Sequence, residues 1–146
     1  MIRRITPADR DIYLAMAWEF YHSEAVLHAV PDENYARAFD EMMRSDAYML
    51  GLIFEWEEQA AGYALLCKTY SQEAGGMAVW IDELYLRPEF RNRGMGKNFF
   101  AELESIVPAA RYRLEIEPDN LRAEKLYKSM GFEELGYKQL VKDIPQ

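Results

Sequence analysis

Residues 86–97, with the sequence LRPEFRNRGMGK, follow a predicted strand and open a predicted helix. This segment holds four basic residues and one acidic residue, and its two glycines, Gly94 and Gly96, stand two positions apart. Glycines at this spacing let the backbone approach a ligand closely, and the N–H groups of a new helix turn bind anionic oxygens. The segment therefore predicts a binding site for a pyrophosphate group.

Two common phosphate-binding loops do not fit this segment. A P-loop requires glycine at position 91 and Ser or Thr after Lys97, where the chain has Arg91 and Asn98. A dinucleotide-binding fingerprint requires a third glycine at position 99, which is Phe99. On spacing alone, a solvated basic patch at a helix N-terminus is an equally good interpretation.

Hydrophobic periodicity along the chain predicts the order β-α-α-β-β-β-α-β-α-β, which is typical of an α/β domain with a mixed sheet. The polar residues Glu57-Glu58-Gln59 are expected to join two strands as a hairpin. Asn120 is expected to cap the last helix, and Gly131 to end it in a left-handed conformation. Strands are expected at residues 2–5, 48–56, 62–70, 79–86, 111–117 and 132–142, and helices at residues 8–21, 32–45, 94–107 and about 120–130.

Length and charge exclude several classes of protein. The 146 residues fit one domain, and 25 acidic against 17 basic residues give a net charge of −8. An acidic chain does not suit nucleic-acid binding, which requires a basic surface. The single Cys67 cannot form an internal disulfide, and no apolar run suits a signal peptide or a membrane span. A cytoplasmic protein without a nucleic-acid or membrane partner is expected.

Two blocks of the sequence resemble one known family. The pattern Arg91-x-x-Gly94-x-Gly96 after a strand is similar to the acetyl-CoA-binding signature of the GNAT superfamily of N-acetyltransferases. The second block is similar to the C-terminal motif of that family, and the two blocks stand in the family's order. The second block consists of Glu115, Asn120, Ala123, Leu126-Tyr127 and Gly131-Phe132.

The resemblance implies a fold and a cosubstrate. The implied fold is one α+β domain over residues 1–146, with a mixed, mostly antiparallel, twisted sheet of six to seven strands. About four helices would flank this sheet, with splayed parallel strands at its centre. The implied cosubstrate is acetyl-CoA, without a metal. The residues implied to bind it are Leu84, Tyr85 and Leu86 at a strand bulge, Arg91, Asn92, Arg93, Gly94, Met95, Gly96 and Lys97 at the pyrophosphate, and Asn120 and Tyr127.

The resemblance also implies how protons move. Tyr127 would protonate the departing thiolate, and a carboxylate would take the proton of the amine, directly or through water. Three carboxylates are candidates for this base: Glu83, Asp82 and Glu115. Strand alternation predicts that the Asp82 and Glu83 side chains lie on opposite faces of the sheet. If Glu83 and Glu115 shared a face, repulsion would raise the pKa of one of them.

The acceptor pocket is implied to lie between the first two helices. Tyr21, His22, Ser23 and His28 are the candidate acceptor-binding residues there, and Trp80 is a further candidate. Each of them has an ordinary structural role as an alternative, and two histidines without further ligands make a poor metal site.

The expected function is acetyl transfer from acetyl-CoA to a primary amine, by direct attack through a tetrahedral intermediate. The acidic charge favours a small cationic amine. Three alternatives stay open: a protein N-terminal or lysine acetyltransferase, a non-catalytic acyl-CoA sensor, and a structural helper subunit. A homodimer is possible.

Overall fold

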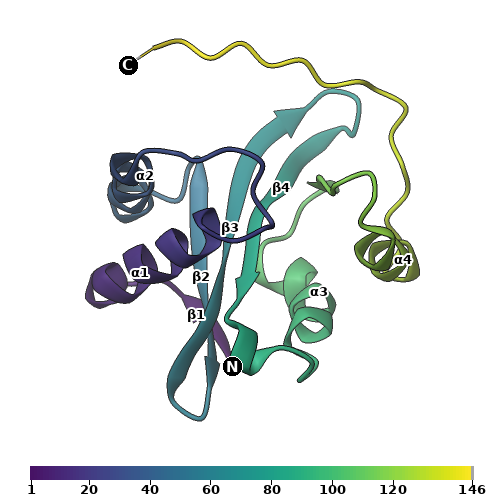
Figure 1. Ribbon diagram of the computed structural model, residues 1–146. Helices are drawn as coiled ribbons and strands as arrows, with labels where there is room; N and C mark the ends of the chain where they lie inside the picture. The colour runs from purple at the N-terminus through teal and green to yellow at the C-terminus, as the bar shows by residue number, and fades with distance from the viewer. Residues whose placement is uncertain (146) are drawn as a thin grey trace. The chain divides into compact units, whose positions relative to one another are not determined.

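The computed structural model describes residues 1–145. Contacts within the chain divide it into two compact units, and the boundary along the sequence lies between Glu115 and Ile116. The first unit contains a five-stranded sheet in the order β1-β2-β3-β4-β5 (Figure 1). Its strands are β1 (Ile2–Arg4), β2 (Met49–Trp56), β3 (Gln59–Ser71), β4 (Gly76–Leu86) and β5 (Arg111–Leu114). Its helices are the 3₁₀ turns η1 (Pro7–Asp9) and η2 (Pro88–Phe90), and α1 (Arg10–Tyr21), α2 (Asp32–Arg44) and α3 (Met95–Ile106).

The sheet is mixed and mostly antiparallel, which confirms the predicted α+β class. Strands β1 to β4 pair antiparallel with their neighbours, and β5 runs parallel to β4. The predicted hairpin of β2 and β3 is confirmed, and its two turn residues, Glu57 and Glu58, have positive φ values of 48° and 64°. A turn with this backbone follows the right-handed twist of the strands it connects. The parallel pair forms one edge of the five strands, whereas the prediction placed it at the centre.

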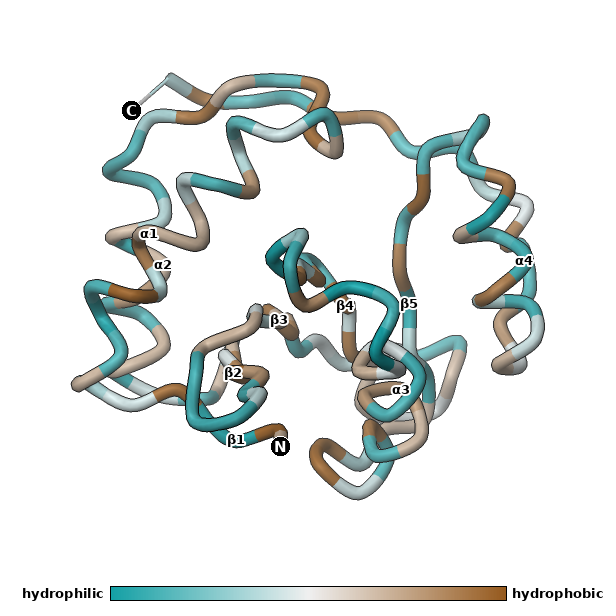
Figure 2. Tube along the Cα trace, turned by 60° about the horizontal axis from the view of Figure 1, so that its bottom comes forward, coloured by the Kyte–Doolittle hydropathy of each residue, from teal (hydrophilic) through white to brown (hydrophobic). Residues whose placement is uncertain are grey.

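Helices cover both faces of the sheet. In Figure 1 and Figure 2, α1 and α2 lie on one side of the strands and α3 lies on the other. Under α3, the Phe54 and Phe99 rings pack edge to face with centroids 5.6 Å apart. Under α1 and α2, the core includes Tyr13, Met16 and Ala17, all with 0% exposure. The helical spacing of Ile12, Met16 and Phe20 predicted that these residues form the buried face of α1. The buried face instead starts one residue later, at Tyr13, and includes Met16 and Ala17.

Strand β4 has a one-residue bulge at Asp82. Glu83 pairs with Leu65 of β3, whereas Ile81 pairs with Leu66, so Asp82 has no partner in this ladder. Leu65 and Leu66 are neighbours and point to opposite faces, so Ile81 and Glu83 also lie on opposite faces. Regular alternation would have placed them on the same face. The bulge thus turns Glu83 to the face covered by α1 and α2.

The prediction for β5 was too long at its C-terminal end. The ladder between β4 and β5 stops where Ile81 pairs with Leu114, directly before the bulge, so Glu115 lies just beyond the strand instead of within it. Within the described residues, the part of β4 from position 82 to 86 has a ladder on its β3 side alone. This divergence of the two strands leaves one backbone edge of β4 open to a further partner.

The second unit contains helix α4 (Leu121–Ser129). Its predicted ends are confirmed, because the Asn120 side chain accepts a hydrogen bond from the Ala123 N–H at 3.1 Å and Gly131 has a φ of 94°. The predicted strand at residues 132–142 is wrong, because residues 132–145 form no regular element. A strand requires a partner for its backbone groups, and this unit offers none among its described residues. Over residues 1–145 the sheet therefore has five strands instead of the predicted six to seven.

In the part of the chain that the structure describes, no helix has both the length and the apolar character to span a membrane.

Candidate active site

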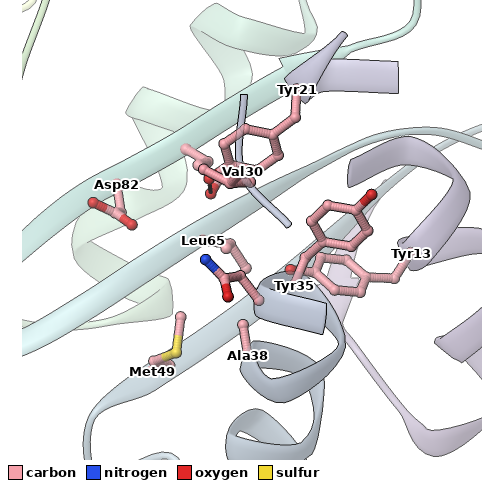
Figure 3. Close-up of a pocket in the computed structure, with 10 residues that line it drawn as sticks. Tyr13, Tyr21, Val30, Tyr35, Ala38, Met49, Leu65 and Asp82 are labelled. Atoms are coloured by element: carbon pink, nitrogen blue, oxygen red, sulfur yellow. Dashed lines mark hydrogen bonds between the residues drawn. The ribbon is translucent and has the colours of Figure 1, made fainter. Parts of the chain in front are cut away.

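A cavity of about 170 Å³ lies between α1, α2 and strands β2 to β4 (Figure 3). Aromatic side chains and two neighbouring carboxylates dominate its wall. Because the bulge turns Glu83, both Asp82 and Glu83 line this cavity, and the prediction that they lie on opposite faces is wrong. The lining residues are Tyr13, Tyr21, Val30, Asn34, Tyr35, Ala38, Met49, Leu65, Asp82 and Glu83.

Two tyrosine hydroxyls hold Glu83 in place. The Tyr21 hydroxyl donates to Glu83 Oε2 at 2.6 Å, and the Tyr63 hydroxyl donates to Oε1 at 2.7 Å. The Glu83 residue is only 8% exposed. Burial raises the pKa of Glu83, while the two tyrosine hydrogen bonds act in the opposite direction because they stabilise the carboxylate. Burial thus outweighs the hydrogen bonds, and a carboxyl group with a raised pKa suits the role of a general base.

The other two predicted carboxylates interact with each other. Burial and the charge of Glu115 raise the pKa of Asp82, although its side chain reaches solvent at the mouth of the cavity. Sequence reasoning expected this repulsion between Glu83 and Glu115. The bulge changes the pairing, because it is Asp82 that stands beside the end of β5, where Glu115 follows Leu114. Three carboxylates thus give the site a negative field.

The segment predicted to bind a pyrophosphate forms an open turn before α3. Gly94 is the N-cap of α3 and has a φ of 80°, a conformation that favours glycine. A Cβ atom placed on Gly94 or on Gly96 would meet no atom of the described residues within 4 Å. The first N–H groups of α3 point out of the helix without intrahelical partners. Backbone donors and free space are therefore available together at this turn.

The basic side chains of this segment have different partners. Arg87 forms a two-pronged ion pair with Glu19 of α1, at 2.8 and 3.0 Å, so its charge is neutralised within the fold. Arg91 donates to the Leu86 carbonyl oxygen at 2.9 Å. The guanidinium of Arg93 lies over the Trp56 ring, 5.0 Å from its centroid. Four basic residues were expected at a pyrophosphate. One of them, Arg87, instead links α1 to the end of β4 through its ion pair with Glu19.

The other predicted cosubstrate residues of the first unit differ in exposure and backbone conformation. Met95 is 8% exposed, so its side chain belongs to the core and its backbone N–H faces the turn before α3. Asn92 has a positive φ of 61°, and Lys97 is exposed in the first turn of α3. The backbones of residues 84–86 pair with β3 in a ladder that runs from Ala64 to Gly62. Their opposite edge is the open edge of β4.

Two predicted residues lie in the second unit. The side-chain oxygen of Asn120 caps α4, since it accepts the hydrogen bond from the Ala123 N–H. The Tyr127 ring packs edge to face against Phe132, with centroids 6.1 Å apart. Burial raises the pKa of Tyr127, so its hydroxyl keeps its proton at neutral pH.

Of the five predicted acceptor-binding residues, Tyr21 lines the cavity. The His22 ring stacks on Trp18 with centroids 4.0 Å apart, and the Ser23 hydroxyl donates to the Phe20 carbonyl oxygen, so both serve the C-terminal end of α1. His28 is exposed in the connection between α1 and α2. Trp80 is half-buried, and the guanidinium of Arg113 lies 4.2 Å from the centroid of its ring.

Sequence reasoning missed three tyrosines of this site: Tyr13, Tyr35 and Tyr63. A signal existed for two of them. Tyr13 and Tyr21 are eight residues apart, about two helical turns, so they share one face of α1. Tyr63 stands two positions before Leu65, on the same face of β3, and Leu65 pairs with Glu83. This second signal depends on the bulge, which the sequence does not reveal.

Comparison with known proteins identifies the family. The profile of the "Acetyltransferase (GNAT) family" matches residues 12–132, which span both compact units. The chain belongs to this family.

Individual relatives are distant. An uncharacterized protein of Mycobacterium leprae is 26% identical over 136 residues, which are 93% of this chain, so the chain spans about a third (35%) of the length of this curated relative. A possible acetyltransferase from Clostridium difficile 630 has a similar structure with a TM-score of 0.83, 16% identity, and coverage of 100% of this chain and 98% of its own. The aminoglycoside acetyltransferase AAC(6')-Iy, solved with a CoA-containing bisubstrate analogue, gives a TM-score of 0.79 at 17% identity, covering 99% and 98% of the two chains. These structures share the fold.

Proposed function

We propose that this protein is an acetyl-CoA-dependent N-acetyltransferase that acts on the primary amine of a small cationic molecule. The observation that carries the proposal is the buried Glu83, held by two tyrosine hydroxyls in a small cavity where β4 leaves β5. Membership of the GNAT family supports acetyl transfer in general. The family match across residues 12–132 also supports one acetyltransferase domain over the whole chain. A cytoplasmic location and a homodimer stay predictions.

The residues of the first unit fit acetyl-CoA in two places. The open edge of β4 at residues 84–86 offers backbone groups to the amides of the pantetheine arm. The turn at Arg91–Gly96 offers helix N–H groups and free space at Gly94 and Gly96 to the pyrophosphate. Acetyl-CoA, when bound, supplies the acetyl group as an activated thioester. Asn120 of the second unit is proposed to contact the pantetheine arm.

Glu83 is the proposed general base. An alkylammonium with a pKa of about 10.4 is neutral in only about one molecule in 2,500 at pH 7, so exposing its lone pair costs about 4.6 kcal/mol. A carboxylate with a raised pKa accepts this proton more readily than an ordinary one does. Each carboxylate oxygen has a second lone pair beyond the one that accepts from tyrosine. Glu83 can therefore take the proton without losing its two supports.

Asp82 and Glu115 are proposed to attract the cationic amine to the cavity. Both lie toward solvent, and an opposite charge would relieve the repulsion between them. Tyr127 is the proposed general acid: its hydroxyl oxygen holds the proton that a departing thiolate requires, and the raised pKa of Tyr127 keeps this proton in place until then.

Tyr21→Phe is expected to move the acid limb of the activity to higher pH. The base works when it is ionised, so activity is lost as pH falls through the pKa of Glu83. Removing the Tyr21 hydroxyl removes a hydrogen bond that lowers this pKa, so protonation begins at a higher pH. The measurement is kcat/KM against pH, with Tyr70→Phe, an exposed tyrosine of β3, as the matched control. A limb that stays in place would show that Glu83 is not the titrating base.

The proposed function is tested by thiol release and by binding. Purified protein with acetyl-CoA is incubated with monoamines, short diamines, amino alcohols, amino sugars and a peptide with a free N-terminus, and free CoA thiol is measured. We expect turnover with one or more small amines above the hydrolysis background. Calorimetry with acetyl-CoA separates the alternatives: binding without turnover on the whole panel would indicate a sensor, and no binding would contradict the proposal.

A further inference from the structure

The Tyr13 hydroxyl is a polar group that the fold leaves unsatisfied. Tyr13 is 0% exposed and lines the cavity, and among residues 1–145 no hydrogen-bond partner for its oxygen is present. The other tyrosines of the wall are paired, since Tyr21 donates to Glu83 and Tyr35 donates to Asp32. A buried hydroxyl without a partner destabilises a fold, and phenylalanine would avoid this cost. The hydroxyl therefore calls for a partner from outside the chain.

The neighbours of Tyr13 fix where its hydroxyl points. Its ring stacks on Phe39 with centroids 5.7 Å apart, and it meets Tyr63 edge to face at 5.3 Å. Figure 3 shows the hydroxyl end of Tyr13 directed toward Leu65 and the interior of the cavity. A ring packed on two sides cannot turn this hydroxyl toward bulk solvent, so the group is held ready for a ligand in the cavity.

We propose that Tyr13 determines acceptor specificity by forming a hydrogen bond with a second polar group of the acceptor. The acceptor is then a compact amine that carries another hydrogen-bonding group at the end away from the reacting nitrogen. This inference deepens the proposed function and rests on it. The volume of about 170 Å³ lies below the roughly 300–1,000 Å³ typical of pockets for drug-sized ligands, which supports a compact molecule.

The charges around Tyr13 favour a cationic second group. Burial, followed by the charges of Glu83 and Asp82, raises the pKa of Tyr13, so its hydroxyl stays protonated and lies in a negative field. No basic side chain is among the residues that line the cavity. An ammonium or a hydroxyl can donate to the Tyr13 oxygen, and the field stabilises the ammonium further. Short diamines are therefore expected to be preferred over amino alcohols, and amino alcohols over monoamines.

The test compares Tyr13→Phe with the wild-type protein and with Tyr70→Phe, an exposed control with the same chemical change. The probes are 1,4-diaminobutane, 4-aminobutan-1-ol and butylamine, which share a four-carbon chain and differ in the second group. Binding is measured by calorimetry without acetyl-CoA, and kcat/KM is measured with it. We expect wild type to prefer the diamine over butylamine by about 10- to 100-fold, the value of one charge-assisted hydrogen bond. Tyr13→Phe should abolish this preference, while Tyr70→Phe retains it.

The melting temperature of Tyr13→Phe shows whether a changed preference comes from the lost hydroxyl or from unfolding of the variant. Because Tyr13→Phe removes an unsatisfied group, its melting temperature should equal or exceed that of wild type. The preference of the wild-type protein for 1,4-diaminobutane over butylamine is a second measurement, and it requires no variant. A wild-type preference near one, or a preference that Tyr13→Phe leaves intact, would overturn the inference. Selective diamine binding that depends on Tyr13, without turnover on any amine, would support the role of Tyr13 and contradict the proposed acetyl transfer.

Discussion

Glu83→Gln is expected to lower kcat at neutral pH by about 100- to 10,000-fold, the usual contribution of a general base. Glutamine keeps the shape of the side chain, and its amide can still hydrogen-bond to the hydroxyls of Tyr21 and Tyr63. It cannot take a proton from an ammonium. Steady-state kinetics with the best amine of the panel would measure the loss. Glu102→Gln, which removes an exposed carboxylate of α3, is the matched control and should leave kcat unchanged.

The unfolding free energy of the same variant, measured against pH, tests the raised pKa of Glu83 without an activity assay. The pKa of Glu83 in the fold is raised above its ordinary value of 4.5. Its contribution to stability is therefore complete below that value and is lost as pH rises through the raised pKa. Glutamine does not titrate, so Glu83→Gln should gain stability relative to wild type as the pH rises from 4.5 through the raised pKa of Glu83. A difference in unfolding free energy that does not change with pH would contradict this reading of the site.

Kinetics of a second variant, Asp82→Asn, distinguish the two carboxylates of β4. If Glu83→Gln kept most of its activity while Asp82→Asn lost it, the base would be Asp82, and Glu83 would position the tyrosines. Equal, modest losses in both variants would favour a base that works through water.

Tyr127→Phe is expected to lower kcat by about 100-fold while leaving the affinity for acetyl-CoA nearly unchanged. The loss falls at the lower end of the range for acid catalysis, because a thiolate whose conjugate acid has a pKa of about 8.5 departs fairly easily without a proton. The packing of the ring against Phe132 is retained in phenylalanine, so the helix end should survive. Rapid-quench measurement of a single turnover, together with calorimetry, separates chemistry from binding.

Tyr137→Phe is the matched control for this variant, since Tyr137 belongs to the same unit and is 68% exposed. The control should retain full turnover. A Tyr127→Phe protein with wild-type kcat would remove Tyr127 from the mechanism, while the assignment of Glu83 would stand.

The sequence predicted the elements of the first unit well, because their periodicities are strong and their ends are marked locally. Asn120 and Gly131 marked the ends of α4 in the same way. The prediction of a strand at residues 132–142 was wrong. Mixed apolar and polar residues form a strand only where a neighbouring strand is available to pair with them. A local sequence pattern does not reveal whether a distant segment is available as a pairing partner.

The site was predicted in part, and the error has one physical origin. Glu83, Asp82 and Tyr21 were identified, yet the relation between the two carboxylates was wrong because a bulge changes which residues share a face. The position of a bulge depends on how two strands register over their whole length. Tyr63 was missed for the same reason, since its contact with Glu83 exists only in the shifted register.

The bulge at Asp82 also limits how this site could arise or disappear. Deleting Asp82 would restore regular alternation and leave Glu83 opposite Leu65, so Glu83 would stay with its tyrosines while the cavity lost its second carboxylate. Taking Asp82 into the ladder at unchanged chain length would instead place Asp82 opposite Leu65 and turn Glu83 to the face of Ile81, away from Tyr21 and Tyr63. The same strand sequence therefore builds the site in the bulged register and loses it in the regular one. Relatives with one residue fewer at this point of β4 are expected to retain the buried glutamate and to lack its acidic neighbour.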